Sequence, residues 1–119
     1  MMECFNPEIS REIVIDSKKY RVNDKYYVIE FSSWDENLRD WLAEKENISL
    51  NDEHISVIDF LRDMFQLNKN HPVIRTVTSE LAMRFGADKG SVKYFHTLFP
   101  KGIHQAFLIA GIPMQDSCC

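Results

Sequence analysis

Cysteine is scarce in this sequence and lies only near its two ends. The three cysteines are Cys4, Cys118 and Cys119, and their spacing matches neither a disulfide framework nor a zinc site. Four histidines are scattered without the spacing of metal ligands: His54, His71, His96 and His104. We therefore expect no metal, no cofactor and no structural disulfide, and thiols that are placed for reactivity.

Long hydrophobic runs are also missing. No segment approaches the roughly 20 apolar residues that a bilayer-spanning helix needs. The first residues include Glu3 and Glu8, where a signal peptide would carry basic residues. A phosphate-binding loop, a nucleophile elbow and a paired-carboxylate arrangement are absent as well. These absences predict a cytoplasmic protein that makes no contact with a membrane.

The composition that is present suits one compact domain. A chain of 119 residues with 45% apolar residues can build one core and is too short for two. Two short β-type runs, 13–15 and 20–22, flank a polar turn and predict a hairpin. A lone hairpin is marginal in water, so it must pack against the rest of the chain.

Apolar residues at helical spacing predict five helices after the hairpin. Their expected ranges are about 35–46, 52–68, 72–85, 92–100 and 103–110. Ser33 and Glu36 have capping-box spacing at the first helix. Pro72 suits the first turn of the third helix, and Gly86 its end. The aromatic residues expected in the core are Trp34, Trp41, Phe65, Phe85 and Phe95.

The predicted fold is mainly α (α+β), a small orthogonal bundle of about five helices with an N-terminal β-hairpin and a flexible C-terminal arm. Within this single domain we expect an N-terminal extension at 1–11, a folded body at 12–110 and a mobile arm at 111–119. Gly111 and Pro113 stop regular structure, and the residues after them show no apolar period.

Charge is distributed unevenly, although the net charge is only -4. Residues 1–63 carry 15 acidic and 8 basic residues, whereas residues 64–119 carry 3 acidic and 6 basic residues. The C-terminal half is therefore the expected side for contact with an anionic partner.

Cys118 is the candidate reactive residue. A cysteine on an unstructured arm is accessible to another protein without a pocket of its own. The residues that separate it from Pro113 give a reach of roughly 17 Å. Asp116 and the terminal carboxylate disfavour the thiolate, so a cation must assist it. Arg75 and Lys101 are the candidate cations, and solvated surface charge is the alternative explanation for both.

Two other functions are compatible with the pattern. The third and fourth predicted helices, joined by residues 86–90, could form a helix-turn-helix that binds nucleic acid. Its nearby cations are Arg84, Lys89 and Lys93. The second alternative is a redox or regulatory interaction protein whose arm senses oxidation, because sensing and carrying both require an exposed thiol.

Several segments from about residue 26 to residue 119 resemble the TusE/DsrC family. They are SSWDENL at 32–38, AEKENISLNDEH at 43–54, FLRDMF at 60–65, HPVIR at 71–75, LFPKG at 98–102 and IAGIP at 109–113, with a cysteine five residues further on. The resemblance implies a mainly helical fold with a C-terminal arm that can swing. It also implies that Cys118, at the penultimate position, is the functional cysteine.

The resemblance is to the TusE branch more than to the DsrC branch. Partners of dissimilatory sulfite reductase have a second cysteine eleven positions before the penultimate one, and here that position is Phe107. TusE-like proteins take persulfide sulfur from a TusBCD complex and deliver it to the thiouridylase MnmA, with its bound tRNA, for 2-thiolation of the wobble uridine. The chain would thus be a sulfurtransferase in the sense of a persulfide carrier, without stand-alone turnover of a small substrate.

The family also suggests which residues assist Cys118. An arginine in the HPVIR segment implies that Arg75 is the first choice and Lys101 the second. Cys119 stands where the family commonly has an aliphatic residue. It could resolve a persulfide on Cys118, but adjacent cysteines bridge only with strained geometry, so a passive role is favoured. Met114, Gln115 and Asp116 replace the usual basic residues and proline of the arm, so its contacts with partners could differ.

Overall fold

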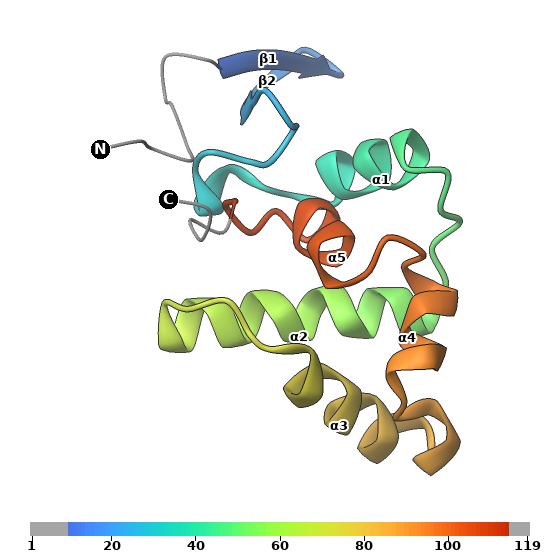
Figure 1. Cartoon of the computed structure of the whole chain (residues 1–119). Coiled ribbons are helices and arrows are strands. Elements are labelled where there is room, and N and C mark those ends of the chain that lie inside the picture. The colour runs from blue at the N-terminus through green and yellow to red at the C-terminus, as the bar shows by residue number, and fades with distance from the viewer. Residues whose placement is uncertain (1–9, 115–119) are drawn as a thin grey trace.

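The computed structural model describes residues 10–114, which form a two-stranded hairpin and a set of packed helices (Figure 1). In chain order the elements are β1 (Ser10–Ile15), β2 (Lys18–Asn23), the 3-10 turn η1 (Phe31–Ser33), α1 (Glu36–Lys45), α2 (Asp52–Asn68), α3 (Ile74–Phe85), the 3-10 turn η2 (Ala87–Lys89), α4 (Val92–Leu98) and α5 (Ile103–Ile109). The expected mainly α fold with an N-terminal hairpin is confirmed.

The hairpin turns at Asp16 and Ser17, which both have positive φ angles. This two-residue turn matches the right-handed twist of the strands and pairs Ile15 with Lys18. One face of the hairpin buries Ile13, Tyr20 and Val22. The hairpin therefore joins the core instead of standing alone in water.

Helix α5 lies at the centre of the molecule (Figure 1). It contacts α1 on one side and α2 on the other, and α3 packs against α2. All residues from Gln105 to Ile109 are buried, as are Ala110 and Ile112 beyond the helix. The full core cluster also includes residues of every other helix, among them Leu38, Leu42, Ile58, Leu61, Leu81, Phe95 and Phe99.

One expected helix cap and one expected helix start are wrong. Asp35, and not Ser33, caps α1: its side chain accepts from the Leu38 amide at 3.0 Å, while Ser33 donates to the carbonyl of Glu30. Helix α3 begins at Ile74, with Val73 as its extended N-cap, so Pro72 precedes the helix. In the loop before α3, His71 bonds to the carbonyl of Pro113, and the helix begins after this contact.

The observed helix ends agree better with the predictions from the sequence than the helix starts do. Helix α2 ends at Asn68, where Lys69 has a left-handed conformation, and α3 ends at Gly86 as expected. Of the five aromatic residues expected in the core, only Phe95 is fully buried, and the other four are half-buried and pack against the core cluster. None of the helices between residues 10 and 114 combines the length and the apolar character that a membrane span requires.

The packed part of the chain extends past residue 110. Gly111 and Ile112 are buried, and Pro113 and Met114 are half-buried. These four residues belong to the segment that the sequence assigned to the arm. The remainder of that segment, residues 115–119 with Cys118 and Cys119, lies outside the described residues, so the mobile arm stays a prediction.

Candidate functional site

The candidate site is built from the last described residues, 110–114, which we call the root because they lead to Cys118. The root begins with a Schellman motif that ends α5. The Gly111 amide donates to the Leu108 carbonyl at 3.2 Å, and the Ile112 amide donates to the Phe107 carbonyl at 3.1 Å. The motif turns the chain sharply out of the helix and buries both Phe107 and Ile112.

Gly111 is required at this turn for two reasons. Its φ angle is +70°, in the left-handed region that favours glycine. A Cβ atom at this position would also lie only 2.0 Å from Cδ1 of Trp34. The indole of Trp34 covers the glycine and donates from Nε1 to the carbonyl of Ile109 at 2.9 Å. The turn and the tryptophan thus hold each other in place.

Arg62 of α2 holds the root from a second side. Its guanidinium Nη1 donates to the carbonyl of Ala110 at 2.9 Å, and Nη2 donates to the carbonyl of Phe31 at 3.0 Å. The guanidinium carbon lies 3.9 Å from the centre of the Phe31 ring and 4.1 Å from that of the Trp34 ring. Arg62 therefore makes flat, directional contacts that a lysine could not reproduce.

The environment of Arg62 is unusual for a surface arginine. Its carbonyl partners carry no formal charge, and none of the described carboxylates lies within ion-pair distance of it. Burial lowers the pKa of the guanidinium from its ordinary value, and the charges of Asp59 and Asp63 oppose that shift. The arginine stays protonated at any physiological pH, so its bonds to the root do not depend on pH.

His71 holds the root from a third side. Its Nε2 atom donates to the carbonyl of Pro113 at 2.6 Å, so the proton of the neutral ring belongs on Nε2. The edge of the imidazole packs against Phe65 and Phe107, with ring centres 5.3 and 5.1 Å apart. We call Trp34, Arg62 and His71 the cradle. The cradle fixes the direction in which the chain leaves the folded body.

Comparison with known proteins identifies the family. The model of the family described as "DsrC like protein" matches residues 14–119. The chain belongs to the DsrC-like family. TusE sulfurtransferases of Shigella dysenteriae and Escherichia coli K12 are each 37% identical over 107 residues, which cover 89% of this chain and 98% of theirs. Because the similar TusE proteins are sulfurtransferases, this similarity supports a role of the chain in sulfur relay.

Solved DsrC structures share the fold. The NMR structure of Allochromatium vinosum DsrC has a TM-score of 0.81 at 31% identity and covers 92% of this chain and 99% of that one. The crystal structure of the oxidized gamma-subunit of dissimilatory sulfite reductase (DsrC) from Archaeoglobus fulgidus has a TM-score of 0.84 at 28% identity, with coverage of 92% and 100%. The hairpin and five helices of this DsrC-like chain are therefore those of the family.

The structure does not bring Arg75 or Lys101 to the described root. Arg75 lies exposed in the first turn of α3. Helices α3 and α5 lie on different sides of α2 (Figure 1). Lys101 lies at the opposite end of α5, where its Nζ is 3.6 Å from Glu46. Neither side chain contacts residues 109–114. Whether either cation assists Cys118 stays a prediction, because Cys118 lies outside the described residues.

The cradle residues were missed by the analysis of the sequence. Trp34 and His71 were assigned to the core and to the surface or a helix end, and Arg62 was not singled out. All three nevertheless lie in the segments that carry the family resemblance: SSWDENL, FLRDMF and HPVIR. The feature of the sequence that could have indicated a role for Arg62 is its place on the apolar side of a helix, one residue after the buried Leu61.

Phe107 occupies the position at which DsrC proper is expected to have its second cysteine. Its side chain is 1% exposed and packs against His71 and His104. A thiol is absent there, so an internal disulfide between this position and Cys118 is not available to this DsrC-like chain.

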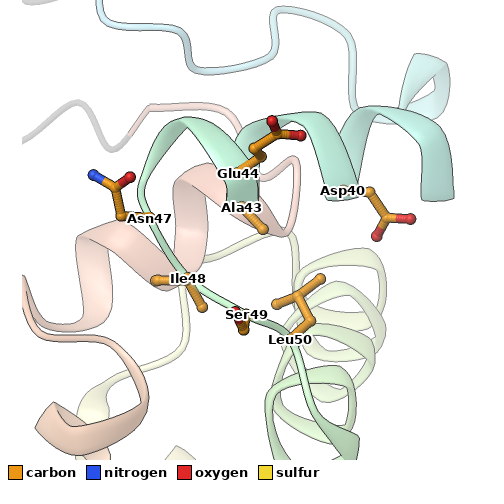
Figure 2. A pocket seen from close by; sticks show the side chains of 7 residues that line it. All are labelled: Asp40, Ala43, Glu44, Asn47, Ile48, Ser49 and Leu50. Carbon is orange, nitrogen blue, oxygen red and sulfur yellow. The ribbon is translucent and has the colours of Figure 1, made fainter.

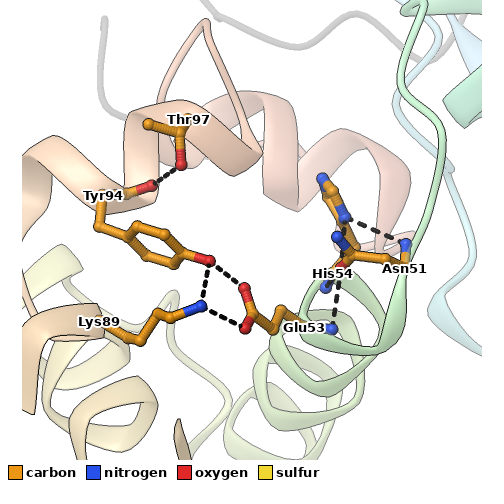
Figure 3. Close-up of polar contacts among 6 residues, drawn as sticks. All are labelled: Asn51, Glu53, His54, Lys89, Tyr94 and Thr97. Carbon is orange, nitrogen blue, oxygen red and sulfur yellow. Dashed lines mark hydrogen bonds and ion pairs between the residues drawn. The ribbon is translucent and has the colours of Figure 1, made fainter. Parts of the chain in front are cut away.

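The nucleic-acid alternative loses most of its cations in the structure. Lys89 donates to Glu53 at 2.8 Å and to Tyr94 at 3.0 Å, and Tyr94 also donates to Glu53 (Figure 3). The hydrogen bond that Lys89 donates to Glu53 raises the pKa of Lys89, so the ammonium stays charged and the carboxylate balances its charge. Arg84 pairs with Glu80. Only Lys93 of the three is left to meet a phosphate.

A hollow at the end of α1 is remote from the root. It has a volume of about 510 Å³ and lies between the end of α1 and the loop to α2 (Figure 2). Its lining residues are Asp40, Ala43, Glu44, Asn47, Ile48, Ser49 and Leu50. It contains no nucleophile or base that the sequence predicted, and residues 10–114 contain no cluster able to hold a metal ion.

Proposed function

We propose that this DsrC-like protein is a cytoplasmic sulfur carrier in which Cys118 bears the sulfur as a persulfide. Sulfur would come from a TusBCD-like donor and pass to an MnmA-like tRNA thiouridylase for 2-thiolation of the wobble uridine. The observation that carries the proposal is the cradle: it holds the chain rigidly up to Pro113, a few residues before Cys118. A rigid root followed by a short segment suits delivery of one thiol into a partner's active site.

The proposed step is an exchange of sulfur between thiols. The Cys118 thiolate attacks the terminal sulfur of the donor persulfide, the donor S–S bond breaks, and the donor cysteine leaves as a thiolate. Cys118 then carries the new S–S bond, and no net oxidation occurs. Delivery repeats the step with the acceptor cysteine as nucleophile and Cys118 as the leaving thiolate.

Roles for the neighbouring residues follow from their chemistry. Leaving as a thiolate is easier beside a cation, which we assign first to Arg75 and second to Lys101. Cys119 is expected to be passive. The segment that carries both cysteines would act as a mobile arm on a single folded domain.

The test is intact-mass analysis after the reduced protein is incubated with a cysteine desulfurase and a loaded TusBCD relay. Wild type should gain one sulfur, about 32 Da. Cys118→Ser should gain none, and Cys119→Ser, which removes the adjacent thiol, is the matched control and should load normally. Absence of loading in wild type, with TusBCD demonstrably loaded, would refute the carrier role.

A further inference from the structure

The outer edge of β1 is open, whereas the outer edge of β2 is covered. Past β2, Val22 forms a bridge with Val28, the Ile29 amide donates to the Arg21 carbonyl at 3.1 Å, and the Asn23 amide donates to the Tyr27 carbonyl at 2.8 Å. Strand β1 pairs with β2 alone among the described elements, and Figure 1 shows it as the outermost strand. Within residues 10–114, one edge of the sheet is therefore free to accept another strand.

The register shows which backbone groups are free. The two-residue turn makes Ile15 and Lys18 a hydrogen-bonded pair, so alternate residues of each strand direct their amide and carbonyl outward. On β2 an outward residue is Arg21, and its carbonyl does bond outward. On β1 the outward residues are Glu12 and Val14. Their amides and carbonyls alternate as donors and acceptors along the open edge.

A hollow of about 350 Å³ lies along the same edge. Its wall includes four consecutive residues, 11–14, and no residue of β2. Consecutive strand residues point to opposite faces, so a hollow that all four line must lie beside the strand and away from β2. Its other walls are the half-buried rings of Tyr26 and Trp41, whose centres are 6.1 Å apart.

Cations surround the aromatic wall. The Arg11 guanidinium lies 5.2 Å and the Lys45 ammonium 4.4 Å from the centre of the Tyr26 ring. Arg11 has no carboxylate within ion-pair distance among the described residues, and Lys45 is 3.5 Å from Glu46. The carboxylate in the hollow, Glu12, lies 3.9 Å from Lys19. The edge therefore presents more positive than negative charge to an incoming chain.

We propose that the open edge of β1 docks an extended, acidic segment of a partner protein by strand addition. The partner's backbone would pair with Glu12 and Val14, and alternate side chains would enter the hollow between Tyr26 and Trp41. Carboxylates on the partner segment would meet Arg11 and Lys45. Nucleic acid fits this edge less well, because a phosphate backbone cannot donate hydrogen bonds to the free carbonyls.

The test uses two capped six-residue peptides, one alternating glutamate with leucine and the other alternating lysine with leucine. Binding is followed by amide shifts and amide exchange of the full-length protein. The glutamate peptide should shift and protect the Glu12 and Val14 amides and shift the Trp41 indole. Equal binding of the lysine peptide, or shifts that avoid β1, would overturn the proposal.

Variants separate strand addition from general charge attraction. Val14→Pro removes an outward amide that no other described residue uses, so the hairpin should fold while peptide binding weakens about tenfold or more. Arg11→Glu should weaken binding similarly, and Arg21→Glu, on the covered strand, is the matched control and should not. Cys118→Ser should bind the glutamate peptide like wild type, so peptide binding tests strand addition independently of the sulfur-carrier proposal.

Two results would assign the edge to another occupant and so contradict the proposal. One is a concentration-dependent dimer that Val14→Pro abolishes, which would identify a second copy of the chain as the occupant. The other is displacement of the glutamate peptide by a short single-stranded RNA that itself shifts the Glu12 and Val14 amides.

Discussion

The two ends of α5 are held by different kinds of contact. At the N-terminal end, Lys101 and Gln105 meet the carboxylate of Glu46, and the Tyr27 hydroxyl donates to the His104 carbonyl at 3.2 Å. At the C-terminal end, Trp34 and Arg62 donate to backbone carbonyls. Because the Lys101 side chain is exposed, its pair with Glu46 is weak and screened by salt. Donors to buried carbonyls determine the path of the backbone itself, which is what a carrier with a terminal thiol requires.

The largest expected effect is that of Gly111→Ala. The substitution combines a left-handed backbone with a Cβ atom placed inside the Trp34 ring, and should lower the free energy of unfolding by about 3–4 kcal/mol. The matched change at the other end, Gly102→Ala, also has a positive φ, but its Cβ would meet only the exposed His96 side chain at 3.2 Å. It should cost about 1–2 kcal/mol by urea denaturation. Equal losses would show that Trp34 does not confine the root.

The next effect is that of Arg62→Met. Loss of the guanidinium leaves the Ala110 and Phe31 carbonyls without their donor, and should lower the free energy of unfolding by about 2–3 kcal/mol. Arg62→Lys should recover only part of this loss, because an ammonium cannot bond to both carbonyls. Arg39→Met, which removes an arginine paired only with its neighbour Asp40, is the control. At a temperature where Arg62→Met and the control Arg39→Met are both folded, sulfur transfer should be slower for Arg62→Met and unchanged for Arg39→Met.

His71→Phe tests the third cradle contact. The phenyl ring keeps the packing against Phe65 and Phe107 but removes the bond to the Pro113 carbonyl, so stability should fall by about 1 kcal/mol. The exposed His96 supplies the control, His96→Phe. Amide exchange at Met114 should rise in the first variant only. No change at Met114 would mean that the histidine packs without holding the root.

A fall in pH should loosen only the N-terminal end of α5. Burial alone would raise the pKa of Glu46. The hydrogen bond from Gln105 and the charges of Lys101 and Lys45 outweigh burial, so the pKa lies below its ordinary value. The carboxylate therefore stabilises the fold above about pH 4.3, and this contribution is lost as the pH falls through the lowered value. Rate-corrected amide exchange should increase at Gln105 and stay unchanged at Ile112, since Arg62 does not titrate.

The smallest effect is that of Lys101→Met. The side chain is 74% exposed, so its pair with Glu46 should contribute less than about 0.5 kcal/mol, and 1 M salt should abolish that difference. If sulfur loading of Cys118 nevertheless slows, Lys101 assists the thiol, as the sequence predicted in second place. Arg75→Met, measured in parallel, tests the first choice.

Local patterns in the sequence were sufficient for most of the fold. Gly86 and the residues around Asn68 end helices where they were expected, because capping depends on a few neighbouring residues. The start of α3 was missed because the loop before it contacts Pro113 through His71, and these two residues are 42 positions apart in the chain. The cap of α1 was missed because Asp35 also accepts from Lys18 and Tyr20 of the hairpin.

Asp35 illustrates how such distant partners act. Burial would raise its pKa, but hydrogen bonds from Lys18, Tyr20 and the Leu38 amide outweigh burial and hold the pKa at about 2. One carboxylate thus joins the hairpin to the start of α1. Ser33 had the right spacing for a capping box but no such partners.

The candidate thiol could be named from sequence, since access and family position are properties of the chain itself. The identity of the residues that surround the root could not, because Trp34, Arg62 and His71 come from three separate segments and meet only when α5 packs between α1 and α2. Every residue has the same backbone carbonyl, so the sequence around a carbonyl does not predict which distant side chain will donate to it. Tertiary packing therefore decided that Arg62 holds the root, a role that no local pattern in the sequence indicated.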